Sequence, residues 1–323
     1  MPTEKNTPPV IVIAGPTASG KSGVALTLAR ELDGVVINAD SMQVYADLRI
    51  LTARPTAEDE AAAPHSLYGV LPAEQPCSAA AWVDMALAEI ALAQSHGRQP
   101  ILVGGTGLYL KALTEGLNQI PAIPAHVRQA TRDLHEQLGG PAFHEQLSRW
   151  DPAMARRLEP GDTQRLIRAW EVMAATNRSL ADWQADEIVG PPPDMRFDLH
   201  ILMPPREPLY AMCDARFLTM IEQGGLDEAA ALAARDLSSD LPAMKAVGVP
   251  ELLAHLGGMI DLSTAIAKAQ QATRNLAKRQ FTWFRNQVLP ERLAPSVHAS
   301  HVYGAQYSES LTTEILQKIR KSR

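Results

Sequence analysis

The stretch VIVIAGPTASGKS, residues 10–22, decides the fold of this chain. The apolar residues Val10–Ala14 predict a buried strand. The residues that follow, from Ser22 to Leu32, have the pattern of a helix. Between strand and helix lies the loop G-x-x-x-x-G-K-S, in the order that a phosphate-binding loop requires.

Each residue type in this loop has a chemical reason to be there. Gly15 and Gly20 allow tight backbone turns, so that successive N–H groups point inward at an anion, and the helix N-terminus adds partial positive charge. Lys21 can reach the outer phosphate, and the Ser22 hydroxyl can ligate Mg²⁺. The predicted diphosphate-binding residues are Gly15, Pro16, Thr17, Ala18, Ser19, Gly20, Lys21 and Ser22. The motif identifies a phosphate, not a reaction.

Outward from this loop, apolar strands alternate with helical stretches. Further strands are predicted at Gly34–Ala39, Pro100–Val103 and Phe197–Met203, and helices at Trp82–Gln94 and from Leu108 to Leu113. This alternation predicts an α/β fold, a P-loop NTPase-like parallel sheet core with helices on its faces. Ligands bind at the carboxyl ends of the strands in such sheets.

The middle of the chain has a different texture. From Ile120 to about Val189 no strand-like run appears, and the segment closes at Gly190-Pro191-Pro192-Pro193, which is typical of a rigid linker. We therefore predict an all-helical insertion domain at 119–193. The catalytic core, with a helical C-terminal part, is predicted to comprise 1–118 and 194–323.

Composition sets the class of protein. The 323 residues are 46% hydrophobic and 20% charged, which is typical of a globular domain, and no apolar run approaches the length of a membrane span. Cys77 and Cys213 have no metal-ligand spacing. The net charge of −6 does not favour a nucleic-acid partner on global charge, although local patches remain possible. We expect a reduced, cytoplasmic monomer without a membrane partner.

Two further features lie just after predicted strands. Asp40 follows the second strand, where a carboxylate can ligate Mg²⁺, cap a helix or act as a general base. A later strand, which in NTPases ends in a Mg²⁺-binding aspartate, here runs into the glycine loop 104–107. The catalytic equipment of an ATPase is therefore incomplete, and the second loop fits a site that holds a diphosphate from two sides.

Several ordered motifs resemble the tRNA dimethylallyltransferases, the IPP transferase family. The resemblance spans roughly residues 9–286. It rests on GPTASGKS at 15–22, DSMQ at 40–43, VGGTGLY at 103–109, DTQRLIRAWEV at 162–172 and AKRQFTWFR at 277–285.

The resemblance implies transfer of a dimethylallyl group from dimethylallyl diphosphate to the N6 amine of the adenosine 3′-adjacent to the anticodon. The implied catalytic residues are Asp40 as base, Thr106 as donor to the released oxygen, and Lys21 and Arg216 on the diphosphate. Arg206 competes with Arg216 for that last role because it is nearby in sequence. Mg²⁺ on Ser22 is the implied cofactor.

The implied partner is the tRNA anticodon stem-loop, whose target base must be flipped into the cleft. The basic residues Lys278 and Arg279, interleaved with aromatic ones, then favour an RNA-facing surface. The tRNA-binding residues expected on this resemblance are Asp40, Ser41, Met42, Gln43, Thr106, Arg128, Gln164, Arg165, Leu166, Ile167, Arg168, Lys278 and Arg279.

Two other functions share parts of this pattern. A small-molecule kinase has the same phosphate loop, but the long insertion and the loop at 104–109 argue against it. A prenyltransferase acting on free adenine nucleotides would use the same chemistry. The helix at 164–168 and the basic residues near Lys278 favour tRNA over free nucleotides.

Overall fold

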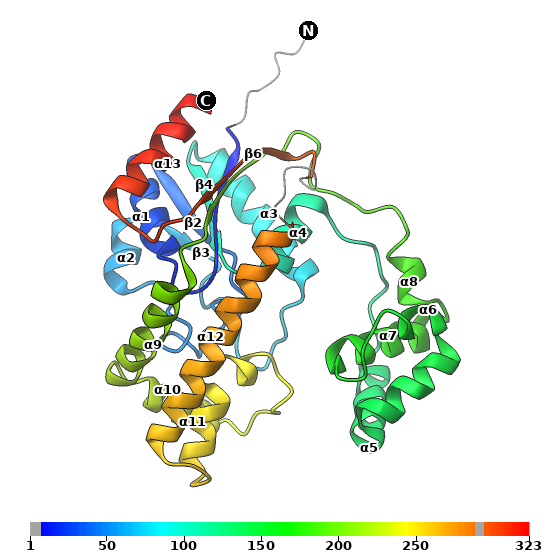
Figure 1. Ribbon diagram of the computed structural model, residues 1–323. Coiled ribbons are helices and arrows are strands. Elements are labelled where there is room, and N and C mark those ends of the chain that lie inside the picture. The colour runs from blue at the N-terminus through cyan, green and yellow to red at the C-terminus, as the bar shows by residue number, and fades with distance from the viewer. Residues whose placement is uncertain (1–7, 288–293, 323) are drawn as a thin grey trace. The chain divides into compact units, whose positions relative to one another are not determined.

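A six-stranded parallel sheet forms the centre of the larger part of the chain (Figure 1). The computed structural model describes residues 8–287 and 294–322. The strand order is β3-β2-β4-β1-β5-β6. The strands are β1 Val10–Ala14, β2 Gly34–Asn38, β3 His65–Ser66, β4 Gln99–Gly104, β5 Phe197–Leu202 and β6 Val297–Tyr303.

Helices cover both faces of this sheet because its central strands are apolar on both faces. Along β1, Val10 and Val12 pack into one hydrophobic cluster, whereas Ile11 and Ile13 pack into another. The first cluster is closed by α3 (Ala79–Ser95), α4 (Gly107–Glu115) and α12 (Leu262–Gln287). The second is closed by α1 (Lys21–Glu31) and α13 (Glu309–Ser322).

The carboxyl ends of three neighbouring strands bring the predicted loops together. β1 pairs in parallel with β4, and β4 pairs in parallel with β2. The phosphate loop, the residues after β2 and the second glycine loop therefore leave the sheet at the same edge. The predicted fold class is confirmed, and the predicted strands agree with β1, β2, β4 and β5 to within one residue at either end.

The last strand, β6, and the last helix, α13, were not predicted from the sequence. β6 extends the sheet beyond β5, with Met203 N–H donating to the Tyr303 carbonyl at 2.7 Å. In the sequence VHASHVY, His298, Ser300 and His301 interrupt the apolar residues, so it lacks the apolar run of a buried strand. α13 then places Leu311, Ile315 and Ile319 against α1 and the sheet.

A group of helices follows β5 and packs on the lower part of α12 in Figure 1. It brings Cys213 and Phe217 of α9 close to the carboxyl edge of the sheet. Its elements are α9 Arg206–Glu222, α10 Gly225–Ala233, the 3₁₀ turn Ala243–Lys245 and α11 Val249–Leu256. The short helix α2, Ala57–Ala62, follows β2 and contacts α1 instead.

Residues Gly116–Gly190 form a separate compact unit. It is helical, with a core around Phe143, Leu147 and Leu166, and among its described residues the β pairing is the isolated bridge between Leu117 and Val189. Its boundaries lie three residues before those expected from the sequence. Its helices are α5 Ala125–Trp150, with a break at Gly139, α6 Pro152–Ala155, α7 Thr163–Thr176 and α8 Leu180–Trp183.

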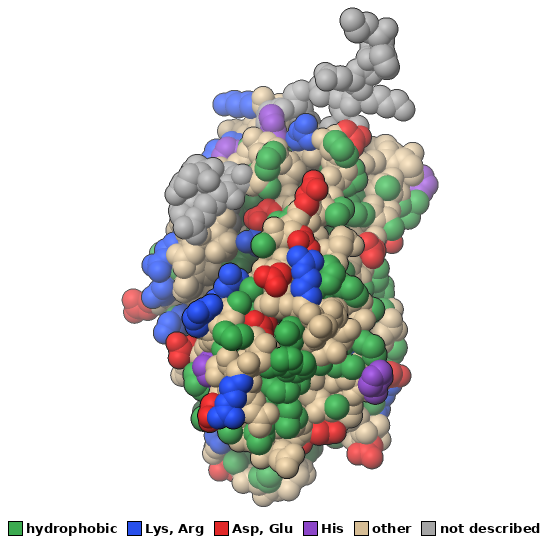
Figure 2. Space-filling model, turned by 90° about the vertical axis from the view of Figure 1, so that its right-hand side faces the viewer, with side chains coloured by type: hydrophobic (Ala, Val, Ile, Leu, Met, Phe, Trp, Pro, Cys, Tyr) green, Lys and Arg blue, Asp and Glu red, His purple; other side chains and the backbone are tan. Residues whose placement is uncertain are grey.

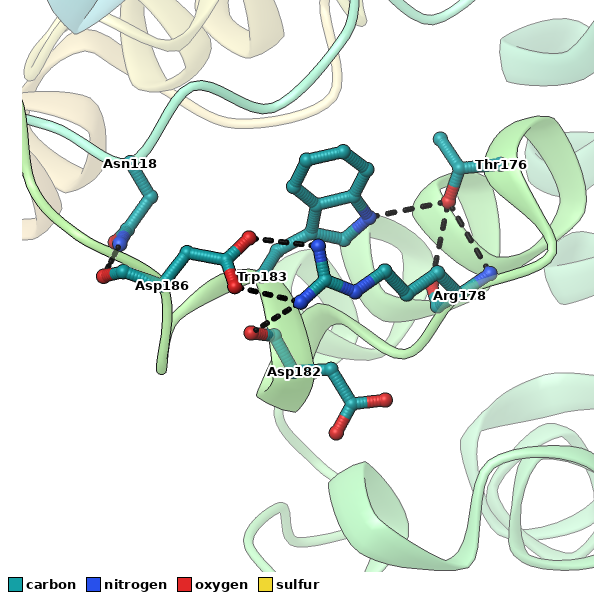
Figure 3. Close-up of polar contacts among 6 residues, drawn as sticks. All are labelled: Asn118, Thr176, Arg178, Asp182, Trp183 and Asp186. Carbon is teal, nitrogen blue, oxygen red and sulfur yellow. Dashed lines mark hydrogen bonds and ion pairs between the residues drawn. The ribbon is translucent and has the colours of Figure 1, made fainter.

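Polar contacts around Arg178 fasten the exit of this unit (Figure 3). The guanidinium donates two hydrogen bonds of 2.6 Å to the Asp186 carboxylate and lies 4.5 Å from the Trp183 ring centroid. The Asn118 amide donates to the Asp186 carbonyl at 3.0 Å, which ties the entering chain to the leaving chain. Arg178 lowers the pKa of Asp186 by hydrogen bonding to its charged form. This arginine therefore has a structural role.

None of the helices in the described ranges combines the length and the hydropathy needed to cross a membrane.

The C-terminal helix is expected to be part of the folding core. Ile315 is fully buried against α1 and the sheet, so Ile315→Ala should lower the free energy of unfolding by about 2–5 kcal/mol. Gln317→Ala, at an exposed position of the same helix, should change it by less than about 0.5 kcal/mol. Urea unfolding followed by circular dichroism measures both, and equal effects would mean that α13 is not packed as described.

Candidate active site

The phosphate loop has the backbone conformation that its glycines were expected to provide. Gly15 has φ 148° and Gly20 has φ 84°, and the latter immediately precedes α1. A Cβ on Gly15 would lie 2.4 Å from the Leu202 carbonyl oxygen of β5. The loop also holds Ala18 at φ 63°, a conformation that costs free energy outside glycine. The N–H groups at the start of α1 are thus presented to an anion.

Tyr307 supports this loop from behind. Its backbone N–H donates to the Ser19 carbonyl at 3.3 Å, and a Cβ on Gly20 would lie 2.3 Å from the Tyr307 Cβ. Its ring also borders Gly23, because a Cβ there would lie 3.2 Å from two of the ring carbons. The segment after β6, to which sequence analysis gave no role, therefore contacts the cradle directly.

Asp40 is held by its neighbours on β2. The Asn38 amide is fully buried, accepts from Asp40 N–H at 2.8 Å and donates to the Asp40 carbonyl at 3.0 Å. One Asp40 carboxylate oxygen accepts from Met42 N–H at 2.9 Å and so closes a turn. Since a turn rather than a helix follows β2, Asp40 does not cap a helix. The other oxygen is not used by this turn. Asp40 is therefore oriented by the backbone and remains half-buried at the strand end.

The second glycine loop brings Thr106 beside the turn after Asp40. Ser41 N–H donates to the Thr106 hydroxyl oxygen at 3.0 Å, and the Thr106 hydroxyl donates to the Ser41 hydroxyl oxygen at 3.3 Å. Close approach requires Gly104, since a Cβ there would lie 2.0 Å from the Ala39 carbonyl oxygen. β4 thus ends in backbone and a hydroxyl where an NTPase would present an aspartate.

Two cations and one carboxylate set the electrostatics of the site. Burial lowers the pKa of Lys21 to about 8, and Asp40 opposes this effect, whereas Arg216 adds to it. Burial also lowers the pKa of Arg216, and Cys213 and Asp40 oppose that change. Arg216 donates to the Thr17 hydroxyl in the phosphate loop. Burial thus destabilises the charged forms of Lys21 and Arg216, and an anionic ligand between them would offset this desolvation cost.

The structure distinguishes the two arginines that competed for the diphosphate. Arg216 contacts the phosphate loop through Thr17. Arg206 instead lies at the start of α9, with its guanidinium 5.0 Å from the Phe281 ring centroid. Geometry therefore favours Arg216 for that role.

A small pocket of about 70 Å³ adjoins these groups. Asp40, Thr17 and Arg216 form its polar part, and the remainder is mostly apolar. Its other lining residues are Met42, Leu51, Thr52, Cys213, Phe217, Met220, Ala246, Val247, Thr273 and Leu276. An apolar lining beside a guanidinium and a carboxylate suits a short hydrocarbon chain with an anionic group at one end.

Gln280 of α12 is a site residue to which sequence analysis gave no role. Its side-chain oxygen accepts from Thr17 N–H at 2.8 Å, and its NH₂ group donates to the Gly105 carbonyl at 3.0 Å. It therefore joins the two glycine loops. The signal available in the sequence was its place within AKRQFTWFR, where a neutral amide lies among basic and aromatic residues.

The expected RNA-binding residues of the core have different surroundings. Met42 lines the pocket, and the Gln43 amide donates to the carbonyls of Thr52 and Ala53 at 2.7 and 3.1 Å. Lys278 and Arg279 are exposed along an open groove on α12. Figure 2 shows one face of the molecule, on which basic, acidic and apolar side chains are interspersed.

In the insertion unit, α7 carries most of the remaining candidates. Gln164 and Arg165 are exposed. Burial lowers the pKa of Arg168; Glu171 opposes this change, and the nearby Arg128 of α5 adds to it. Ile167 is half-buried. Leu166 is fully buried in the core of the unit. The prediction that Leu166 contacts RNA is therefore wrong for its side chain, because helical periodicity turns that position inward.

The donors present fit a Mg²⁺ ion that is held largely by a ligand's phosphate oxygens. Ser22 is exposed in the first turn of α1, one residue after Lys21. Within residues 8–287 and 294–322 there is no cluster of three or more His, Cys, Asp or Glu side chains that could hold a metal ion. Mg²⁺ commonly keeps several waters and takes one or two protein oxygens beside phosphates.

Comparison with known proteins agrees with this geometry. The family profile of IPP transferase matches residues 43–287, and that of isopentenyl transferase matches residues 8–66. The tRNA dimethylallyltransferase of Rhodospirillum centenum is 57% identical over 286 residues, which is 88% of this chain and 91% of the relative. That of Paramagnetospirillum magneticum is 54% identical over 97% of this chain and 96% of the relative.

Solved structures give the same result. The tRNA isopentenylpyrophosphate transferase from Bacillus halodurans superposes with a TM-score of 0.66 at 31% identity, covering 97% of both chains. A eukaryotic dimethylallyltransferase described as acting on tRNA superposes with a TM-score of 0.76 at 25% identity, covering 97% of this chain and 78% of that one. On these grounds, the chain belongs to the IPP transferase family, to which the tRNA dimethylallyltransferases belong.

Proposed function

We propose that this chain transfers a dimethylallyl group from dimethylallyl diphosphate to the exocyclic N6 amine of the adenosine 3′-adjacent to the anticodon in tRNA, with release of diphosphate. The observation that carries the chemistry is the pocket in which Asp40 and Arg216 adjoin an apolar lining. Such a pocket fits a short prenyl chain between an anion and a base. The tRNA dimethylallyltransferase relatives support the substrate class.

In this reaction the phosphate loop takes the diphosphate. The N–H groups before α1 and the charge of Lys21 stabilise the negative charge that grows on the leaving group. Arg216, already placed on the loop through Thr17, adds a second cation. Thr106 donates a hydrogen bond to the released oxygen once its hydroxyl turns away from Ser41.

Asp40 acts on the nucleophile. An aromatic amine is weakly nucleophilic, so the bond from the allylic carbon to the diphosphate oxygen breaks as the bond to N6 forms. The Asp40 oxygen not used by Met42 accepts a hydrogen bond from the amine and then its proton. The apolar pocket keeps water from the allylic carbon, which would otherwise be hydrolysed.

Mg²⁺ belongs to the proposal as the ion that Ser22 would hold with the diphosphate. When bound, it would neutralise part of the leaving-group charge. We also propose that the protein is cytoplasmic and monomeric.

The RNA surface is proposed on each unit by itself. In the insertion it consists of Arg128, Gln164, Arg165 and Arg168, and in the core of Lys278 and Arg279 on α12. Arginine side chains suit this purpose because they bind phosphates and stack on unpaired bases.

Transfer is tested with the purified protein, Mg²⁺ and labelled dimethylallyl diphosphate. We expect label in an anticodon stem-loop RNA, and a loss of at least about 10²-fold in rate for Asp40→Asn, which removes the base but keeps the shape. Asp84→Asn, at an exposed position on α3, is the matched control and should retain the wild-type rate.

Other outcomes of this assay would contradict the proposal. Label in AMP but not in the stem-loop would move the substrate to free adenine nucleotides. No transfer to either acceptor, with ATP hydrolysis stimulated by a small molecule, would indicate a kinase.

The pKa of Lys21 predicts how diphosphate affinity varies with pH. Lys21 is charged below pH 8 and neutral above it, so the affinity for inorganic pyrophosphate should fall above pH 8, by at most about tenfold per pH unit. Lys21→Arg stays charged throughout and serves as the control for the titration of pyrophosphate itself. Calorimetry between about pH 7 and pH 9.5 compares the two slopes, and identical slopes would rule out this role of Lys21.

Removal of an exposed arginine of α7 should weaken RNA binding. Arg165→Ala is expected to lower the affinity for the stem-loop severalfold and to reduce the slope of log K against log[salt] by about 0.7–0.9, because one phosphate contact is lost. Arg149→Ala, an exposed arginine of the same unit paired with Glu145, is the control. Fluorescence anisotropy at several salt concentrations measures both, and equal slopes would count against α7 as an RNA surface.

A further inference from the structure

We propose that Gln280 is a positioning residue for prenyl transfer, which sets the spacing of the two glycine loops through a single side-chain amide. This inference rests on the proposed function. Gln280 comes from α12, whereas the loops follow β1 and β4. The side chain is half-buried, so its two hydrogen bonds are partly shielded from water.

The orientation of the amide is fixed by its partners. The oxygen accepts from Thr17 N–H at 2.8 Å, and the nitrogen donates to the Gly105 carbonyl at 3.0 Å. The opposite orientation would place a donor against a donor and an acceptor against an acceptor. The site therefore requires one donor and one acceptor on the same short group, which glutamine supplies.

Each loop contact lies one step from a residue of the proposed chemistry. Thr17, whose N–H is bound, also accepts the hydrogen bond of Arg216 through its hydroxyl. Gly105, whose carbonyl is bound, directly precedes Thr106. Gln280 thus fixes the position of Arg216, the proposed diphosphate ligand, relative to Thr106, whose hydroxyl is proposed to donate to the released oxygen.

The second glycine loop lies close to the Gln280 amide. A Cβ on Gly105 would lie 2.4 Å from the Gln280 nitrogen and 2.9 Å from the Gly15 carbonyl oxygen. The glycine in the second loop is therefore matched to the amide of α12. One turn further along this helix, a Cβ on Gly107 would lie 2.3 Å from the Trp283 ring.

Two substitutions separate positioning from packing. Gln280→Met keeps a similar length and removes both hydrogen bonds, and it should lower kcat of prenyl transfer about tenfold to a hundredfold. Its affinity for stem-loop RNA without donor should remain that of the wild type, because Lys278 and Arg279 are unchanged. Gln271→Met, exposed on the same helix, is the matched control and should keep the wild-type kcat.

Gln280→Glu gives a pH signature that a packing role would not. The ionised carboxylate still accepts from Thr17 but faces the Gly105 carbonyl with no proton, so kcat should be low near pH 8. The protonated carboxyl has one donor and one acceptor, like the amide. The ratio of the wild-type kcat to the variant kcat should therefore fall as the pH is lowered from about 8 toward 5.

The outcomes are distinguishable. If the wild type transfers no label to RNA, the proposed function fails. If the wild type is active and Gln280→Met retains its kcat, or if the ratio for Gln280→Glu is independent of pH while circular dichroism shows a folded protein, the positioning role of Gln280 is refuted. A low kcat for Gln280→Met with a pH-dependent ratio for Gln280→Glu supports it.

Discussion

The whole arrangement depends on the close approach of backbone segments at the carboxyl edge of the sheet. Gly104 lies against the Ala39 carbonyl and Gly15 against the Leu202 carbonyl, at distances that exclude any side chain. Parallel pairing of β4 with β2, and of β1 with β5, brings these strand ends together. Because main-chain groups meet there, N–H and C=O groups rather than side chains form most of the cradle, and a few side chains adjust it.

The glycine positions explain why so much of the site could be predicted. A glycine-bracketed loop between an apolar strand and a helix has few other structural meanings, so the cradle and its strand followed from local pattern alone. Asp40 could be predicted in the same way, because it directly follows an apolar strand. The fold class and the family were predicted correctly for this reason, because the residues with chemical roles directly follow strands that the local pattern identifies.

Long-range contacts were beyond a reading of local pattern. Nothing near residue 280 indicates that its amide reaches Thr17, which is 263 residues earlier in the chain. β6 was missed because it joins the sheet by pairing with β5 and, apart from Tyr303, has half-buried or exposed residues rather than an apolar run. Leu166 was misplaced for a related reason: a motif resemblance names a segment, whereas helical periodicity decides which of its side chains face outward.

The contact of Tyr307 with the phosphate loop has a consequence for how the protein is made. On the ribosome, Tyr307 is added 287 residues after Gly20, the loop residue that it supports. β1, at the centre of the sheet, must likewise await β5. Such sequence-distant pairing slows folding and leaves apolar strands without partners during translation. The phosphate loop therefore gains its contact with Tyr307 only after residue 307 has been added. A nascent chain that stalls before that point has the complete phosphate-loop motif but lacks the segment that packs against it.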